Sequence, residues 1–177
     1  MTDHDGPVPA ADPAGRDRAW FEDLFTAHAG AVHRYFLRRA PRDDVEDLTA
    51  DVLATAWRRR ADLPEGHELP WLYRTAGFVL ANHRRKGRPV PVESLPDDAD
   101  GEYAADPADL VLADAQVSDA LAALSDRDRH VLMLHAWEGL DGEELAAALG
   151  IGRGGAAAAL SRARARLRSA WDERVTA

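Results

Sequence analysis

The chain has 177 residues, enough for one compact domain or two small ones, and its 22 basic and 31 acidic side chains leave a formal net charge of -9. That charge argues against a free-standing, high-affinity nucleic-acid binder. Disulfides and thiolate metal sites are excluded because the chain has no cysteine. No apolar run approaches the roughly 20 residues needed to cross a bilayer, and the N-terminus has no apolar signal-peptide core, so we expect a cytoplasmic protein without membrane insertion.

Residues 1–17 are rich in Pro, Gly, Asp and Ala, and they predict a disordered tail. Apolar residues then recur at three- and four-residue steps, which predicts a first helix. A second helix follows "PRDD", where Asp43 or Asp44 can cap it, with acids at its start and arginines at its end, as the helix dipole favours. The predicted buried face of the first helix consists of Phe21, Leu24, Phe25, His28, Val32, Tyr35 and Phe36.

A third helix is predicted after the loop "ADLPEGHELP", with Pro70 in its first turn. Its opposite side and C-terminal end are basic. From 89 to 107, prolines, acids and a glycine replace helical periodicity, which indicates an acidic linker between domains rather than a loop within one core. The predicted buried side of the third helix comprises Leu72, Thr75, Ala76, Val79, Leu80 and His83.

Residues 108–177, after the linker, are also predicted to be helical. "SDRD" offers Ser125 as a helix cap with Asp128 reaching back, and Gly150 can take the left-handed turn between a short helix and a long final one. No strand is expected anywhere. The predicted fold class is therefore all-α, with two small helical domains, 18–88 and 108–177, joined by a flexible acidic linker.

The charges are segregated along the chain. Five basic side chains and no acid lie between Trp71 and Arg88, and the same holds between Arg153 and Arg168. The intervening segment 89–110 has seven acids and no base. A basic final helix behind a glycine turn is typical of a helix-turn-helix that binds DNA, and aromatic residues beside cations suit single-stranded bases. A solvated charged face is the alternative interpretation, but the final helix lacks the interleaved acids that such a face usually has.

Three stretches together resemble the extracytoplasmic-function (group IV) sigma factors of the sigma-70 family of bacterial RNA polymerase. They are "DVEDLTADVLATAWRRR" (44–60), similar to family region 2.2, "PWLYRTAGFVLANHRRKGR" (70–88), similar to regions 2.3 and 2.4, and "ALSDRDRHVLMLHAWEGLDGEELAAALGIGRGGAAAALSRARARLR" (123–168), similar to region 4. The order and spacing of the three make the resemblance specific.

The resemblance implies a promoter-specificity subunit that binds core RNA polymerase and promoter DNA. Region 2-like residues 18–88 would dock on the polymerase and would recognise and melt the -10 element, and region 4-like residues 108–177 would contact the -35 element. The implied polymerase-binding residues are Asp44, Glu46, Asp47, Asp51, Trp57 and Arg58. The implied -10 residues are Trp71, Arg74, Asn82, His83, Arg84, Arg85, Lys86 and Arg88. The -35 residues are Arg153, Gly154, Ser161, Arg162, Arg164 and Arg166.

The start of the final helix departs from the family pattern. Four alanines, Ala156 to Ala159, stand where family members usually carry polar and basic side chains. Alanine offers only a methyl contact to thymine, so we expect the helix to clamp phosphates and to discriminate weakly among -35 sequences.

Two other functions are considered beside this one. A stand-alone helix-turn-helix regulator would bind duplex DNA tightly by itself, and a helical adaptor would bind only protein. An enzyme is not expected, because no metal-binding histidine pattern and no phosphate-binding glycine loop occurs, and no cofactor is predicted. The family commonly works under an anti-sigma factor, and the exposed helices of this chain can accept one.

Overall fold

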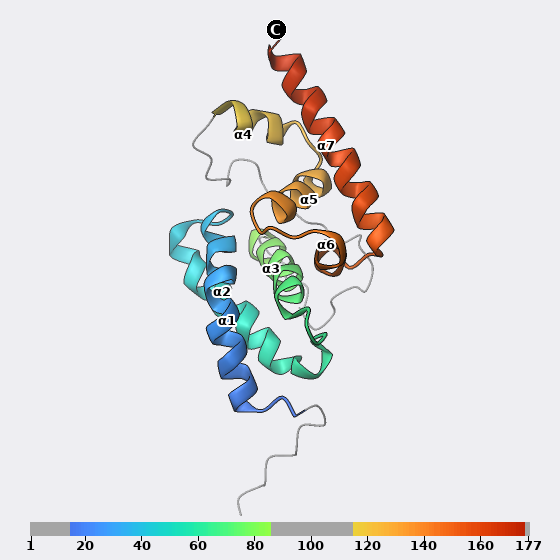
Figure 1. The fold of residues 1–177 in the computed structure, drawn as a ribbon. Helices are drawn as coiled ribbons and strands as arrows, with labels where there is room; N and C mark the ends of the chain where they lie inside the picture. Colours follow the sequence, from blue (N-terminus) through green and yellow to red (C-terminus); the bar gives the residue numbers. More distant parts are fainter. Residues whose placement is uncertain (1–14, 86–114, 176–177) are drawn as a thin grey trace, which may run out of the picture.

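The computed structural model describes residues 15–85 and 115–175, and all regular structure in these ranges is helical (Figure 1). The prediction of an all-α fold is confirmed. Most of the predicted tail, the predicted linker 89–107, Lys86 and Arg88 lie outside the described residues.

The first half of the fold is a packed set of helices, α1 to α3. Helix α1 begins after Asp17, whose Oδ1 accepts a hydrogen bond of 3.0 Å from the backbone N–H of Trp20. Asp44 occupies the N-cap position of α2, but its carboxylate makes no capping bond, because a 3-10 turn already in helical conformation leads into the helix. Its carboxylate contacts His83 instead, at 3.1 Å. The bounds are Arg18–Leu37 for α1, Arg42–Asp44 for η1, Val45–Arg58 for α2, Arg60–Asp62 for η2 and Glu68–Arg84 for α3.

The second half contains α4 (Ala115–Ala122), α5 (Asp126–Ala136), α6 (Gly142–Leu149) and α7 (Arg153–Val175). Ser125 caps α5 as predicted, since its Oγ accepts a hydrogen bond of 3.2 Å from the N–H of Asp128. The Asp128 carboxylate in turn accepts a bond of 2.6 Å from the Ser125 hydroxyl rather than reaching the backbone. Gly150 takes the predicted left-handed conformation (φ 66°), which turns the chain from α6 into α7.

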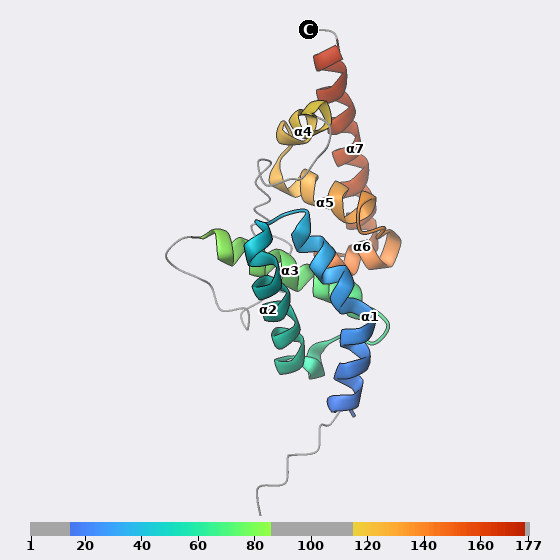
Figure 2. The same ribbon diagram turned by 90° about the vertical axis from the view of Figure 1, so that its left-hand side faces the viewer.

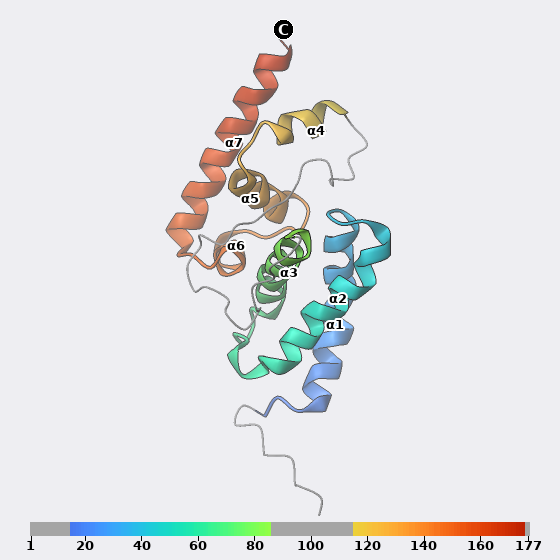
Figure 3. The ribbon, with the colours of Figure 1, turned by 180° about the vertical axis from the view of Figure 1, so that it is seen from behind.

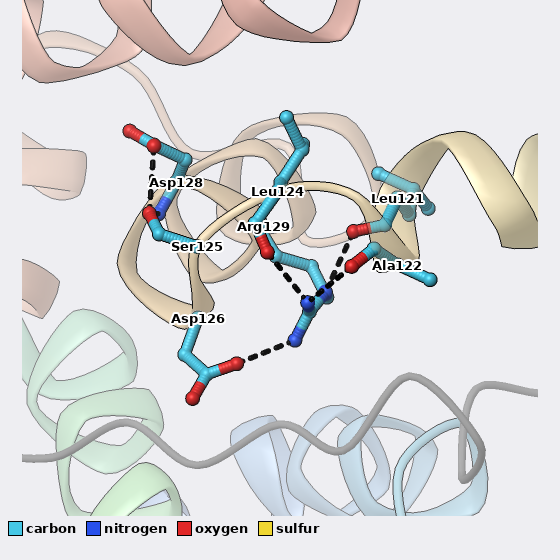
Figure 4. A network of polar contacts seen from close by, with 7 residues as sticks. All are labelled: Leu121, Ala122, Leu124, Ser125, Asp126, Asp128 and Arg129. Carbon is cyan, nitrogen blue, oxygen red and sulfur yellow. Dashed lines mark hydrogen bonds and ion pairs between the residues drawn. The ribbon is translucent and has the colours of Figure 1, made fainter. Parts of the chain in front are cut away.

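A buried arginine holds the turn between α4 and α5 (Figure 4). Arg129 donates from Nε to the carbonyl of Leu121 (2.9 Å) and from Nη2 to that of Leu124 (2.8 Å). Its Nη1 bonds Asp126 at 2.7 Å. The Leu121 carbonyl, at the end of α4, also accepts the backbone N–H of Leu124 at 3.1 Å, so the arginine side chain ties the end of this helix to the turn that follows it.

The two halves pack directly against each other, with α6 lying along α3. In Figures 2 and 3 the start of α1 and the end of α7 lie at opposite ends of the molecule, with this contact between them. One apolar cluster crosses the contact: it includes Leu72 and Ala76 of α3 together with Leu145 and Leu149 of α6. We call this contact the seam.

Helix α3 is buried on more sides than the sequence predicts. It was expected to show a basic face opposite its buried side, but Trp71, Tyr73 and Gly77 are also buried. The Trp71 ring lies under the Arg59 guanidinium and the Tyr73 ring lies 5.7 Å from the Tyr35 ring of α1, while α6 packs along the same helix. His83, expected on the buried side, is exposed at the end of the helix. Phe25, expected in the core of α1, is 51% exposed.

Candidate nucleic-acid interface

Helix α7 presents a basic outer face. Arg153 and the arginines at 162, 164, 166 and 168 are all exposed, as is Ser161. Within the alanine run, Ala156 and Ala159 are buried, and Ala163 is buried one turn later. Ala157 and Ala158 are exposed. Half of the alanine run thus packs, and the exposed half carries no hydrogen-bonding side chain.

Three of these arginines have partners within the same half of the protein. Arg153 lies 3.4 Å from Glu143, an exposed pair that contributes little to stability. Arg164 donates a hydrogen bond of 2.6 Å to His135 Nε2, while His135 Nδ1 donates to the Leu140 carbonyl. The tautomer of this histidine is therefore set by the carbonyl, which can only accept.

Arg166 pairs with Asp128 near the start of α5. Burial alone would raise the pKa of Asp128, but the Ser125 hydroxyl and the cations of Arg166 and Arg162 outweigh it and hold that pKa below its usual value. Asp128 therefore stays charged and orients Arg166, whose side chain remains 59% exposed.

The residues expected to bind the -10 element fall into two groups at opposite ends of α3. Asn82, His83, Arg84 and Arg85 lie together at its C-terminal end. Trp71 is about 20 Å away along the helix axis, at about 1.5 Å per residue. Its side chain belongs to the core, 9% exposed, beneath the Arg59 guanidinium.

The C-terminal end of α3 is tied to the neighbouring helices. Arg84 donates a hydrogen bond of 2.6 Å to the carbonyl of Arg39, and His83 contacts Asp44 at 3.1 Å. Arg85 is exposed. Asp44, expected to face the polymerase, thus lies beside the cations of α3.

Arg74 lies at the seam. Its guanidinium packs over the α-carbon of Gly150, so closely that an added β-carbon there would stand 2.6 Å from Arg74 Cζ. The expected -10 residue Arg74 is therefore brought to the helix-turn-helix rather than to the exposed end of α3.

The outer face of α2 carries Glu46, Asp47, Asp51, Trp57 and Arg58, all exposed. The Trp57 ring lies edge-on against Phe21 of α1, with centroids 5.3 Å apart, and the Arg60 guanidinium covers it at 4.5 Å. We call this surface, with Phe21 and Phe25 of α1, the acidic-aromatic face. Phe25 was missed as a surface residue because it fits the helical period of the buried stripe, whereas Phe21 is half-buried against the core as well as against Trp57.

The comparisons with known proteins agree with this layout. The family model for sigma-70 region 2 matches residues 24–89, and that for sigma-70 region 4 matches residues 114–167. The chain belongs to the extracytoplasmic-function group of the sigma-70 family. Sigma-70 region 2 thus covers most of α1 with all of α2 and α3, and region 4 covers α4 to α6 and most of α7.

Its relatives are sigma factors. The RNA polymerase sigma-E factor of Streptomyces avermitilis is 39% identical over 161 residues, which cover 87% of this chain and 86% of the relative. The ECF RNA polymerase sigma factor SigE of Mycolicibacterium smegmatis is 32% identical over 169 residues. The match covers 85% of this chain and 65% of that relative's length.

Two solved structures share the sigma-70 fold. CnrH in complex with the cytosolic domain of CnrY aligns with a TM-score of 0.61 at 24% identity, covering 90% of this chain and 92% of that one. The sigma factor RpoE in complex with the anti-sigma factor NepR from Bartonella quintana aligns with a TM-score of 0.54 at 24% identity. This alignment covers 86% of this chain and 96% of RpoE.

No group of three or more His, Cys, Asp or Glu in the described residues could hold a metal ion. In the same residues, no helix combines the length and the apolar character that crossing a membrane requires.

The sequence interpretation of this sigma-70 chain missed a buried charged cluster at the seam. Glu138, in the turn after α5, lies 2.6 Å from Arg38 and 2.8 Å from Arg39, both at the end of α1. The Tyr73 hydroxyl also donates to Glu138; burial first, then the Glu138 charge and this bond, raises the pKa of Tyr73 to about 12. No sequence spacing links these residues, which are about 100 positions apart.

Proposed function

We propose that this chain is a promoter-specificity subunit that binds core RNA polymerase and directs transcription initiation. The observation that carries the proposal is the presence, in one sigma-70 chain, of an exposed cationic face on α7, the exposed Arg85 at the end of α3 and a separate acidic-aromatic face. Cations on helices bind DNA phosphates, whereas a face that joins acids to an exposed tryptophan suits a protein partner. The polymerase would perform the chemistry, and this chain would supply binding and strand capture.

In this proposal the acidic-aromatic face docks on the polymerase through Glu46, Asp47, Asp51, Trp57 and Arg58. The C-terminal end of α3 meets the -10 element, where Arg85 and the neighbouring Lys86 contact the backbone and help to hold melted bases. The outer face of α7 meets the -35 element through Arg153, Ser161 and Arg162, with Arg164 and Arg166 on phosphates. Trp71 is assigned to the support of α3, because its ring is part of the core.

The -35 contact is proposed to be weak in sequence discrimination. After Arg153, the exposed positions in the first two turns of α7 are Gly154, Gly155, Ala157 and Ala158, which have no side-chain hydrogen-bonding group. Scrambling the -35 hexamer should therefore cost less than the about 1 to 3 kcal/mol that each well-read base pair usually contributes. A loss of transcription as large as that from a scrambled -10 element would contradict this.

The test of the function is run-off transcription with core polymerase, with permanganate mapping of the open complex. Arg85→Ala combined with Lys86→Ala should abolish melting while the affinity for polymerase is kept. Arg84 is left in place because its bond to the Arg39 carbonyl also supports the fold. Arg42→Ala, which removes an exposed cation from η1, is the matched control and should melt the promoter normally.

The alternatives give different results in the same experiment. A stand-alone regulator would bind duplex DNA tightly without polymerase, with a steep dependence on salt. A protein-binding adaptor would keep its partner but never open a promoter. Failure of core polymerase both to capture the chain and to start RNA synthesis would reject the proposal.

We further propose an anti-sigma factor as a second partner. The support is that RpoE, which shares this fold, is held by the anti-sigma factor NepR in the related structure. Such a partner would compete with core polymerase for this chain, so added core enzyme should displace it.

A further inference from the structure

The seam between the two halves contains charged groups that are shielded from water. The side chains of Arg39 and Glu138 are 1% and 2% exposed, and Arg38, at the rim, is 29% exposed. Arg39 also stacks on the Tyr35 ring at 3.8 Å and lies 5.4 Å from the Trp137 ring. The Glu138 carboxylate is thus surrounded by two guanidinium groups and the Tyr73 hydroxyl, all from the first half of the chain.

The closed seam hides Arg74 of α3, which the resemblance to the family places among the -10 residues. Arg74 is covered by the turn at Gly150, and α6 lies along the same side of the helix. While the seam is closed, promoter DNA cannot reach this part of α3.

The closed seam also brings the two proposed DNA-binding surfaces too close together. Promoter positions -10 and -35 are about 25 base pairs apart, which is about 85 Å at about 3.4 Å per base pair. In this structure α3 and α6 touch, and α6 leads directly into α7. The 29 residues between Arg85 and Ala115 could span about 100 Å if fully extended, so the chain is long enough to open.

We infer that Glu138, held by Arg38, Arg39 and Tyr73, is an ionic latch that keeps the free chain closed, and that the latch opens when the chain reads both promoter elements. This inference rests on the proposed function. The net free energy that a buried ion pair contributes is close to zero, because the cost of removing both ions from water offsets their attraction. A seam held in this way can open reversibly when polymerase and DNA bind the separated halves.

Removing one partner of the latch should shift the equilibrium of the seam towards the open state. In Glu138→Gln the cation of Arg39 stays buried without its carboxylate, and separation of the halves would return that cation to water. Loss of one partner of a buried pair typically shifts such an equilibrium about a hundredfold or more. The ratio of open to closed molecules should then rise by about that factor in the free chain, against the apolar contacts that remain across the seam.

The test is a distance measurement between spin labels in the full-length chain. Because the chain has no cysteine, Ala27→Cys on α1 and Ala165→Cys on α7 provide two exposed labelling sites, neither of which is itself a proposed binding residue. Double electron-electron resonance should give one narrow distance in the parent chain and a longer, broad distribution in Glu138→Gln. Glu144→Gln, an exposed residue of α6, is the matched control and should keep the narrow distance.

A check of folding and a second variant accompany the distance measurement. Circular dichroism checks that Glu138→Gln is folded; if it is not, Arg38→Gln, at the rim of the latch, should give a partial shift to longer distances. Unchanged distances in the folded variants would overturn the latch even if transcription is normal. If no transcription occurs but the distances lengthen, the latch stands and the proposed function fails.

Discussion

At the scale of single residues, position 150 has two structural requirements that only glycine satisfies together. Its φ of 66° favours glycine, and its α-carbon is covered by Arg74. A side chain at this position would be strained and would also displace Arg74 from the seam.

We therefore expect Gly150→Ala to destabilise the protein by more than about 1 kcal/mol, measured by chemical denaturation. Gly152→Ala is the matched control, because a β-carbon there would meet nothing within 4 Å and its φ is not positive. Equal stability of the two variants would contradict the role assigned to Gly150.

His130 makes stability depend on pH. Burial, and next the nearby charge of Arg39, lowers its pKa from 6.5 to about 3. Between these two values the unfolded chain binds one proton more than the folded chain, so stability falls as the pH is lowered from about 6.5 towards 3.

This proton alone should reduce the folding equilibrium constant about tenfold for each pH unit in that window. Denaturation curves at a series of pH values measure the slope of the unfolding free energy against pH. In His130→Gln, whose side chain does not titrate, this slope should correspond to one proton fewer taken up on unfolding. An unchanged slope in the variant would show that His130 is not the group responsible.

At the scale of elements, α7 shows how an alanine run serves two purposes. Ala156, Ala159 and Ala163 are small enough to bring the helix close to α5 and α6, while Ala157 and Ala158 leave a bare outer surface. The same composition therefore supports packing and weakens base recognition.

The α4 to α5 turn depends on Arg129, which is buried and bonds the carbonyls of Leu121, in α4, and Leu124, in the turn. Arg129→Ala should destabilise the protein by about 3 kcal/mol, since both buried carbonyls lose the guanidinium donor. Thermal unfolding followed by circular dichroism measures this. Arg127→Ala, an exposed neighbour on the same helix, should have a much smaller effect, and a similar loss in both would contradict the assignment.

At the scale of the whole molecule, one apolar cluster spans both sigma-70 regions. We expect the free chain to unfold in a single cooperative calorimetric transition, because separation of the halves exposes shared core. Glu138→Gln should split this into two transitions. Two transitions in the parent chain would show that the halves are independent when free.

Much of the fold could be predicted from local pattern. The helices, the Ser125 cap and the left-handed Gly150 follow from periodicity and turn chemistry, which act over a few residues. The basic face of α7 and the exposed acids of α2 were also predictable, because the period of a helix decides which side chains share a face.

Other features could not be predicted because they depend on contacts between distant segments. Phe25 fits the buried period of α1, yet no helix in residues 15–85 or 115–175 covers it. Trp71 and Arg74 fit a DNA-binding surface, yet the Trp71 ring lies in the core and Arg74 lies against the turn at Gly150. The sequence alone determined the helices, the charge segregation and the family resemblance, since each is written in residues close along the chain. Only the tertiary structure decided the seam and the Glu138 cluster, because burial and ion pairing depend on which surfaces meet in space.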